Sequence, residues 1–190
     1  MGAFVLRAVP LAVALAVLAG CGGGSSGGTA ASAAPLPVLP VSAVRGLPAS
    51  THDLEAHQLA ADAGKGSALE QDLARWGFQR GRERVFQGES HTLSLVVSRT
   101  LEFGSPVGAR AYVRFVAGHV GTLFGAGSAA RGVEIGGRAG YLVSVAACAC
   151  HMAQPAVAVV LGKGDRVTYL QLNGPAATPT AARRLADEAP

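Results

Sequence analysis

The last third of the chain alternates apolar stretches with very short polar turns. The apolar stretches cover residues 133–135, 139–148, 156–161 and 166–173. Gly136-Gly137 separates the first two, and Gly162-Lys163-Gly164-Asp165 separates the last two. Turns of this length join antiparallel strands, because a parallel pair needs a crossover of roughly a dozen residues or more. The sequence therefore predicts a largely antiparallel sheet.

Two more strands and a helix are predicted before this region. Residues 78–86 and 92–103 alternate between apolar and polar side chains, which indicates a hairpin. The apolar face of the second strand carries Leu93, Leu95, Val97, Leu101 and Phe103. Ser105-Pro106 then supplies a cap followed by a first-turn proline, so a helix is expected over residues 105–124.

Further helices are predicted at both ends of the domain. The first begins at a cap on Ser50 or Thr51 and runs to about Ala61, the second covers residues 67–76, and the last covers residues 178–188. The predicted fold class is α+β. It is a largely antiparallel sheet of about six strands, covered by helices on one face.

The first twenty residues have the organisation of a bacterial signal peptide. Arg7 precedes an apolar run from Ala8 to Ala19, which is shorter than the ~20 residues that span a bilayer. The segment Leu18-Ala19-Gly20-Cys21 resembles the bacterial lipobox, which implies cleavage before Cys21 and transfer of a diacylglyceryl group to its thiol. We therefore expect a lipoprotein with acyl chains such as palmitate, anchored to the extracytoplasmic face of the cell membrane.

A tether is predicted between the anchor and the folded part. The stretch after Cys21 is rich in glycine and serine and then in alanine and proline, a composition typical of flexible and semi-rigid linkers. The predicted organisation is a signal peptide over residues 1–20, a lipid anchor and disordered tether over 21–48, and a single α+β domain over 49–190.

The charge of the chain is too small to indicate nucleic-acid binding. The formal net charge is +4 and falls to +3 when Arg7 leaves with the signal peptide, and aromatic residues make up 5% of the chain. Such a chain offers few rings for stacking on bases and little attraction to phosphates. We expect no nucleic-acid partner, and a membrane contact through the lipid on Cys21.

Two segments of the domain carry a resemblance to a family. Residues 73–78 read Leu-x-x-Trp-Gly-Phe and residues 105–111 read Ser-Pro-x-Gly-Ala-Arg-Ala. In this order they resemble uncharacterised lipoproteins of GC-rich Gram-positive bacteria and, more loosely, small-ligand or sensor domains displayed on lipid anchors. The resemblance implies a fold and a location, and it brings no known activity.

No catalytic signature is found in the domain. The segment 88–91 begins like a nucleophile elbow but lacks its closing glycine, and the 162–165 turn lacks the spacing of a phosphate-binding loop. Asp53 and His57 would share a face of the first predicted helix, where a solvated polar surface is expected rather than a metal site. The stripe of Arg80, Arg82 and Arg84 is interpreted as a solvent-facing surface, with Glu83 or Glu102 as candidate ion-pair partners; contact with phosphates or acidic partners is the alternative.

One cluster, Cys148, Cys150 and His151, does stand out. It contains both cysteines that remain besides the lipidated one, and an even number in an oxidising compartment suggests a disulfide. Cysteines two apart on a regular strand have Cα atoms about 6.5–7 Å apart, so a bond requires the chain to leave extended geometry there. Reduced thiols, or a metal site formed by the three residues, are the alternatives.

The sequence therefore predicts a non-catalytic, membrane-tethered binding or interaction domain without a cofactor. Its expected partner is a small apolar ligand held between the sheet and helix 105–124, or another envelope protein. The alternative function is metal binding or thiol redox chemistry at Cys148, Cys150 and His151.

Overall fold

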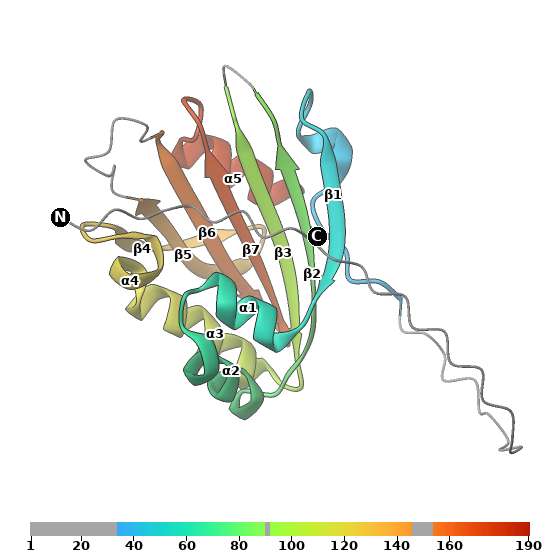
Figure 1. Ribbon diagram of the computed structural model, residues 1–190, viewed down its shortest axis with the longest axis vertical. Coiled ribbons are helices and arrows are strands. Elements are labelled where there is room, and N and C mark those ends of the chain that lie inside the picture. The colour runs from blue at the N-terminus through green and yellow to red at the C-terminus, as the bar shows by residue number, and fades with distance from the viewer. Residues whose placement is uncertain (1–33, 90–91, 146–153) are drawn as a thin grey trace, which may run out of the picture. The chain divides into compact units, whose positions relative to one another are not determined.

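A computed structural model describes residues 34–89, 92–145 and 154–190, and from residue 34 onward the chain forms one compact unit. Its strands are β1 (Ala49–Leu54), β2 (Phe78–Gln87), β3 (Leu95–Phe103), β4 (Ala129–Ile135), β5 (Arg138–Val145), β6 (Ala156–Lys163) and β7 (Arg166–Asn173). They form one sheet in the order β1-β2-β3-β7-β6-β5-β4, with every neighbouring pair antiparallel (Figure 1). The α+β class and the antiparallel sheet are confirmed, with seven described strands rather than about six.

The helices cover both faces of this sheet. They are η1 (Val41–Ala43), α1 (Ala56–Asp62), α2 (Gly66–Arg75), α3 (Pro106–Gly118), α4 (Val120–Phe124) and α5 (Pro179–Glu188). Helices α1 to α4 pack on one face, whereas α5 packs on the other (Figure 1). The expectation that helices cover a single face is wrong for α5.

The reason lies in the central strands, which are apolar on both sides. In β6, Val157, Val159 and Leu161 face the α5 side, while Ala158 and Val160 face the side of α1 to α4. A strand that buries both sets of side chains needs a cover on each face, as in sheets with helices on both sides. The amphipathic α5 supplies the second cover.

The additional strand β1 replaces most of the first predicted helix. Its residues pair with β2 from Ala49 opposite Phe86 to Leu54 opposite Gly81. Helix α1 starts only after Glu55, whose backbone amide donates to the Gln58 side chain at 2.9 Å in a capping box. The predicted helix cap at Ser50 or Thr51 rested on the local sequence alone. In the structure both residues pair with the edge of β2, so no helix starts there.

The folded unit begins earlier than the sequence predicts. Residues 34–48, assigned to the tether, bury the side chains of Leu36, Val38, Leu39, Val44 and Leu47. The Leu39 amide donates to Ser98 Oγ at 3.1 Å, and the segment thereby covers β3 on the α5 side of the sheet. The rest of the predicted tether, and the signal peptide, lie outside the described residues.

The predicted helix over residues 105–124 is divided at His119. Ser105 caps α3 as expected, since its side chain accepts from the Gly108 amide at 3.2 Å. The backbone of His119 leaves helical geometry, with φ −118° and ψ 21°, and α4 begins at the next residue. Gly118 weakens the helix just before the break, because glycine disfavours helix by about 1 kcal/mol relative to alanine.

A buried arginine holds the end of α5. Arg138, 7% exposed, donates from Nη1 to the Ala189 carbonyl oxygen at 2.9 Å and from Nη2 to that of Ala186. The last carbonyls of a helix have no partner within the helix, and the guanidinium satisfies them. Burial lowers the pKa of Arg138, and the charge of Asp187 opposes this shift. None of the described helices is long and apolar enough to cross a membrane.

Candidate functional site

A small, partly open cavity lies on the face of the sheet that α1, α3 and α4 cover. Its volume is about 130 Å³. Its lining is mixed, since apolar side chains form part of the wall and five polar residues on α1, α3, β3 and β7 form the rest. The wall residues include Leu59, Leu69, Phe115, Val116, Leu123 and Phe124, and the polar residues are Asp62, Arg99, Tyr112, Tyr169 and Gln171.

Strand register sets two of these five polar residues, Arg99 and Tyr169, side by side. His52, Glu83, Arg99 and Tyr169 lie directly opposite one another in a row across β1, β2, β3 and β7. Residues that pair directly across antiparallel strands share a face of the sheet. This row therefore places a charged pair, with a histidine and a tyrosine at its two ends, beneath α1.

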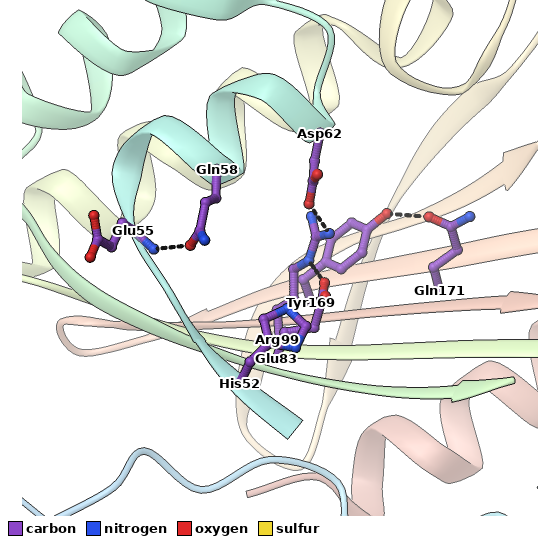
Figure 2. Close-up of polar contacts among 8 residues, drawn as sticks. All are labelled: His52, Glu55, Gln58, Asp62, Glu83, Arg99, Tyr169 and Gln171. Atoms are coloured by element: carbon purple, nitrogen blue, oxygen red, sulfur yellow. Dashed lines mark hydrogen bonds and ion pairs between the residues drawn. The ribbon is translucent and has the colours of Figure 1, made fainter. Parts of the chain in front are cut away.

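Arg99 is the centre of the row. Its Nε donates to the Glu83 carboxylate, and its Nη2 donates to Asp62 Oδ2 at 2.6 Å (Figure 2). The Arg99 side chain is 16% exposed and that of Glu83 is 7% exposed, whereas Asp62 at the end of α1 is 47% exposed. Glu83 is also 3.0 Å from His52 Nε2. The guanidinium is thus held by one buried and one half-exposed carboxylate.

The guanidinium remains charged at every ordinary pH. Burial alone would lower the pKa of Arg99, but the charge and hydrogen bond of Glu83 outweigh it, so that the pKa is raised. The guanidinium carbon also lies 5.5 Å from the centroid of the Tyr169 ring, in the range of a cation–π contact. The cavity therefore contains a fixed positive charge with two negative neighbours.

The two tyrosines at the cavity stay protonated as well. Burial raises the pKa of Tyr112 to about 12, and burial likewise raises the pKa of Tyr169. The Tyr169 hydroxyl donates to Gln171 Oε1 at 2.6 Å (Figure 2). Gln171 Nε2 in turn donates to Asn173 Oδ1 at 3.0 Å. Both hydroxyls are consequently hydrogen-bond donors rather than bases at neutral pH.

The two segments that carry the family resemblance meet beside this cavity. Gly108 on α3 packs so closely on the end of α2 that a Cβ there would lie 1.8 Å from the Trp76 carbonyl oxygen. The Trp76 ring in turn lies 5.5 Å from the Phe115 ring, between centroids. These residues hold α3 over the sheet, and their role is to position the cavity wall.

A wider hollow of about 400 Å³ lies between α3 and strands β4 to β6. It is lined by Arg110 and Arg114 on α3 and by Gly132 and Gly162 on the sheet, among others. Both arginines are exposed. The cavity at Arg99 is the stronger candidate, because largely buried polar groups converge on it, whereas the arginines at the wider hollow are exposed.

The other candidate residues from the sequence either form no site in the structure or lie outside the described residues. Asp53 lies on β1 rather than on a helix, with its Oδ1 4.0 Å from Arg82 Nε, so it does not share a helical face with His57. The described residues contain no group of three or more metal-ligating side chains. Cys21, Cys148, Cys150 and His151 lie outside the described residues.

The arginine stripe on β2 holds neighbouring segments in place. Arg80 Nε donates to Glu102 Oε2 at 2.5 Å, and Arg84 Nη1 donates to the Leu39 carbonyl oxygen at 2.7 Å. Arg84 also donates to Thr51 on β1 at 2.8 Å. The expected pairing with Glu102 is present at Arg80, and Arg84 in addition links β2 to β1 and to the N-terminal segment.

Sequence reasoning did not single out Arg99, Glu83 or Asp62. The sequence contains one signal of the site. Arg99 lies among the alternate positions of its strand that are otherwise apolar, between Val97 and Leu101, where a charge is unexpected. A buried charge needs a partner, and its partners lie on two other elements, β2 and α1. Their approach follows from the fold and not from any local spacing.

The comparisons with known proteins identify no family. No family model matches the chain, and no curated protein matches it. A solved structure, the extracellular domain of PknH from Mycobacterium tuberculosis, is similar with a TM-score of 0.46 and 12% sequence identity, over 75% of this chain and 76% of that one. At this level the likeness carries no statement about function.

Proposed function

We propose that this protein is a non-catalytic binding domain of the bacterial cell envelope, and that the cavity at Arg99 is its ligand site. The observation that carries the proposal is a partly open space of about 130 Å³, lined by apolar side chains on one part and on the other by mostly buried polar groups around Arg99. Apolar walls with a few convergent polar groups are typical of small-molecule sites.

The chemistry of the polar end favours recognition over catalysis. Arg99 is tied to two carboxylates, and the Tyr112 pKa of about 12 makes its hydroxyl a poor base. A general base works best with a pKa near the operating pH. Groups of this kind orient a ligand by hydrogen bonds.

The location outside the cell is part of the same proposal. It is supported by the apolar run over residues 8–19 and by the lipobox-like segment that ends at Cys21. Replacing Cys21 with alanine should release the protein from the membrane fraction, because no acyl chain can then be attached. Retention of Cys21→Ala in membranes after a high-salt wash would contradict lipid anchoring.

Native mass spectrometry of protein extracted from its own membranes tests the binding function. We expect a small molecule to co-purify with the protein and to be lost in Ala63→Trp, since Ala63 lines the cavity and is half-buried. Ala61→Trp is the matched control, because Ala61 is in the last turn of α1, two residues before Ala63, but is exposed. A co-purifying molecule that survives Ala63→Trp would place the ligand elsewhere.

A further inference from the structure

The Tyr112 hydroxyl is a buried donor without a partner. Tyr112 is 5% exposed, and among the described residues nothing forms a hydrogen bond with its hydroxyl. None of the described side-chain polar atoms is cut off from both solvent and a hydrogen-bond partner, so this hydroxyl is not fully enclosed, and Tyr112 lines the cavity. The Tyr169 hydroxyl, by contrast, is already occupied by Gln171 at 2.6 Å.

Arg99 adds further donors to the same end of the cavity. A guanidinium has five N–H groups in a fixed plane. In the described structure Nε is used by Glu83 and Nη2 by Asp62, while Nη1 donates to neither of them. Arg99 also lies close enough to Tyr112 for its charge to lower the pKa of that hydroxyl, against the larger effect of burial. Among the described residues, the Tyr112 hydroxyl and the Arg99 guanidinium therefore have donors free at this end, and the second oxygen of the Asp62 carboxylate is a free acceptor beside them.

The charges around these donors select against ionic ligands. Two carboxylates, Glu83 and Asp62, already flank the single guanidinium. An anionic ligand would add a third negative charge in a space of low dielectric constant. A cationic ligand could pair with Asp62, but it would add a second positive charge beside Arg99 and could not accept from the Arg99 and Tyr112 donors. An uncharged acceptor avoids both penalties.

From this we infer that the ligand is uncharged at the end that enters the cavity, where it places a carbonyl oxygen against the Tyr112 hydroxyl and the Arg99 guanidinium. This inference rests on the proposed function and names the chemical class of its ligand. The apolar part attached to the carbonyl lies against Leu59, Val116 and Leu123. The volume of about 130 Å³ is close to that of a cavity of roughly 150 Å³ known to hold benzene, so this part is the size of one ring or a short branched chain.

Four small probes of nearly equal size test the inference. Benzamide, benzoate and benzamidinium share one shape and are neutral, negative and positive, and toluene lacks a polar group. Dissociation constants are measured by NMR titration at neutral pH, using the chain from residue 22 onward, which keeps the whole compact unit of residues 34–190. Benzamide should bind at least about 5-fold more tightly than each of the other three, the equivalent of one good hydrogen bond.

Tyr112→Phe isolates the hydroxyl, because it keeps the ring and its packing. We expect benzamide to bind about 3- to 10-fold more weakly to this variant and toluene to bind equally well. Tyr141→Phe is the matched control, since Tyr141 lines the other hollow and should leave both affinities unchanged. An amide fingerprint spectrum like that of the parent protein verifies that Tyr112→Phe is folded.

The outcomes separate the ligand class from the binding function. Tighter binding of benzoate or benzamidinium, or equal binding of benzamide to Tyr112→Phe, would overturn the uncharged acceptor and leave the cavity as a binding site. Equal binding of toluene and benzamide would also overturn it, because the polar end would then contribute nothing. Failure of all four probes to bind would overturn the proposed site as well.

Discussion

Replacing Glu83 with glutamine should destabilise the domain by about 2 kcal/mol. The Glu83 side chain is 7% exposed and accepts from Arg99, which is itself 16% exposed, so the pair is largely removed from water. A hydrogen bond to a charged group contributes roughly 1.5–3 kcal/mol, and loss of one partner of a buried pair costs roughly 3–5 kcal/mol. The value lies at the low end because glutamine keeps an acceptor oxygen and Asp62 still pairs with Arg99.

Urea unfolding at neutral pH measures this loss, with thermal unfolding as a second reading. A loss of this size lowers the melting temperature by about 4–8 °C in a domain of roughly 150 residues. Glu188→Gln is the control, since Glu188 is 40% exposed in its pair with Arg184 on α5 and should change stability by less than about 0.5 kcal/mol. A Glu83→Gln loss no larger than that of the control would refute the buried pair.

A double variant distinguishes the buried charge from simple packing. Glu83→Leu alone leaves the guanidinium without its buried partner, whereas adding Arg99→Met removes the charge too. Replacing both members of a buried pair with apolar residues is often neutral, because the desolvation penalty disappears with the charges. The double variant should therefore be more stable than Glu83→Leu, and a double variant that is equally or less stable would show that the charge is not the cause.

The remaining predictions concern packing, pH and thiols. Gly108→Ala should lower the free energy of unfolding in urea by about 1–3 kcal/mol or more, because the added Cβ would lie 1.8 Å from a backbone oxygen. In Gly118→Ala the added Cβ meets nothing within 4 Å, so this variant should stabilise the helix by about 0.5–1 kcal/mol. A hydrogen bond from Arg80 lowers the pKa of Glu102 below its ordinary value of 4.5. The stability that the ionised Glu102 contributes is therefore present above that pH and is lost as the pH falls below it. Glu102→Gln should reduce this loss of stability in acid, which urea midpoints between pH 6 and 2 can measure. Cys148 and Cys150 should be joined in one easily reduced disulfide, and two thiols alkylated in the oxidised native protein would exclude it, while stoichiometric co-purified metal would favour the metal site.

The parts of the fold that follow from local signals were predictable. The β6–β7 hairpin follows from its turn at residues 162–165, and the start of α3 follows from Ser105-Pro106. In both places the signal and the structure that it specifies lie within a few residues of each other. Turn and cap chemistry of this kind acts through the local backbone and needs no distant partner.

The parts that depend on distant partners were not predictable. β1 looked like the start of a helix because the edge of β2 that it pairs with is roughly thirty residues away along the chain. The segment before it looked like a tether because the hydroxyls of Ser98 and Thr100, which hold it to β3, are about sixty residues away. The amphipathic pattern of α5 indicates a buried side but does not specify which face of the sheet receives it.

The candidate site is the extreme case of this limit. Arg99, Glu83, Asp62 and Tyr112 come from four different elements, and none of them belongs to a recognisable motif. Only the charge of Arg99 in an apolar strand phase marked the place. The cavity also depends on the break in the helix at His119, because α4 begins after it and carries Leu123 and Phe124, which form part of the wall.

An NMR titration of side-chain methyl groups with benzamide tests the central claim most directly. If the cavity at Arg99 is the ligand site, the perturbed methyl groups should be those of Leu59, Leu69 and Val116, which line it. The methyl groups of Val133, which lines the other hollow, should not shift. Perturbation confined to Val133, or no perturbation at saturating benzamide, would contradict the account.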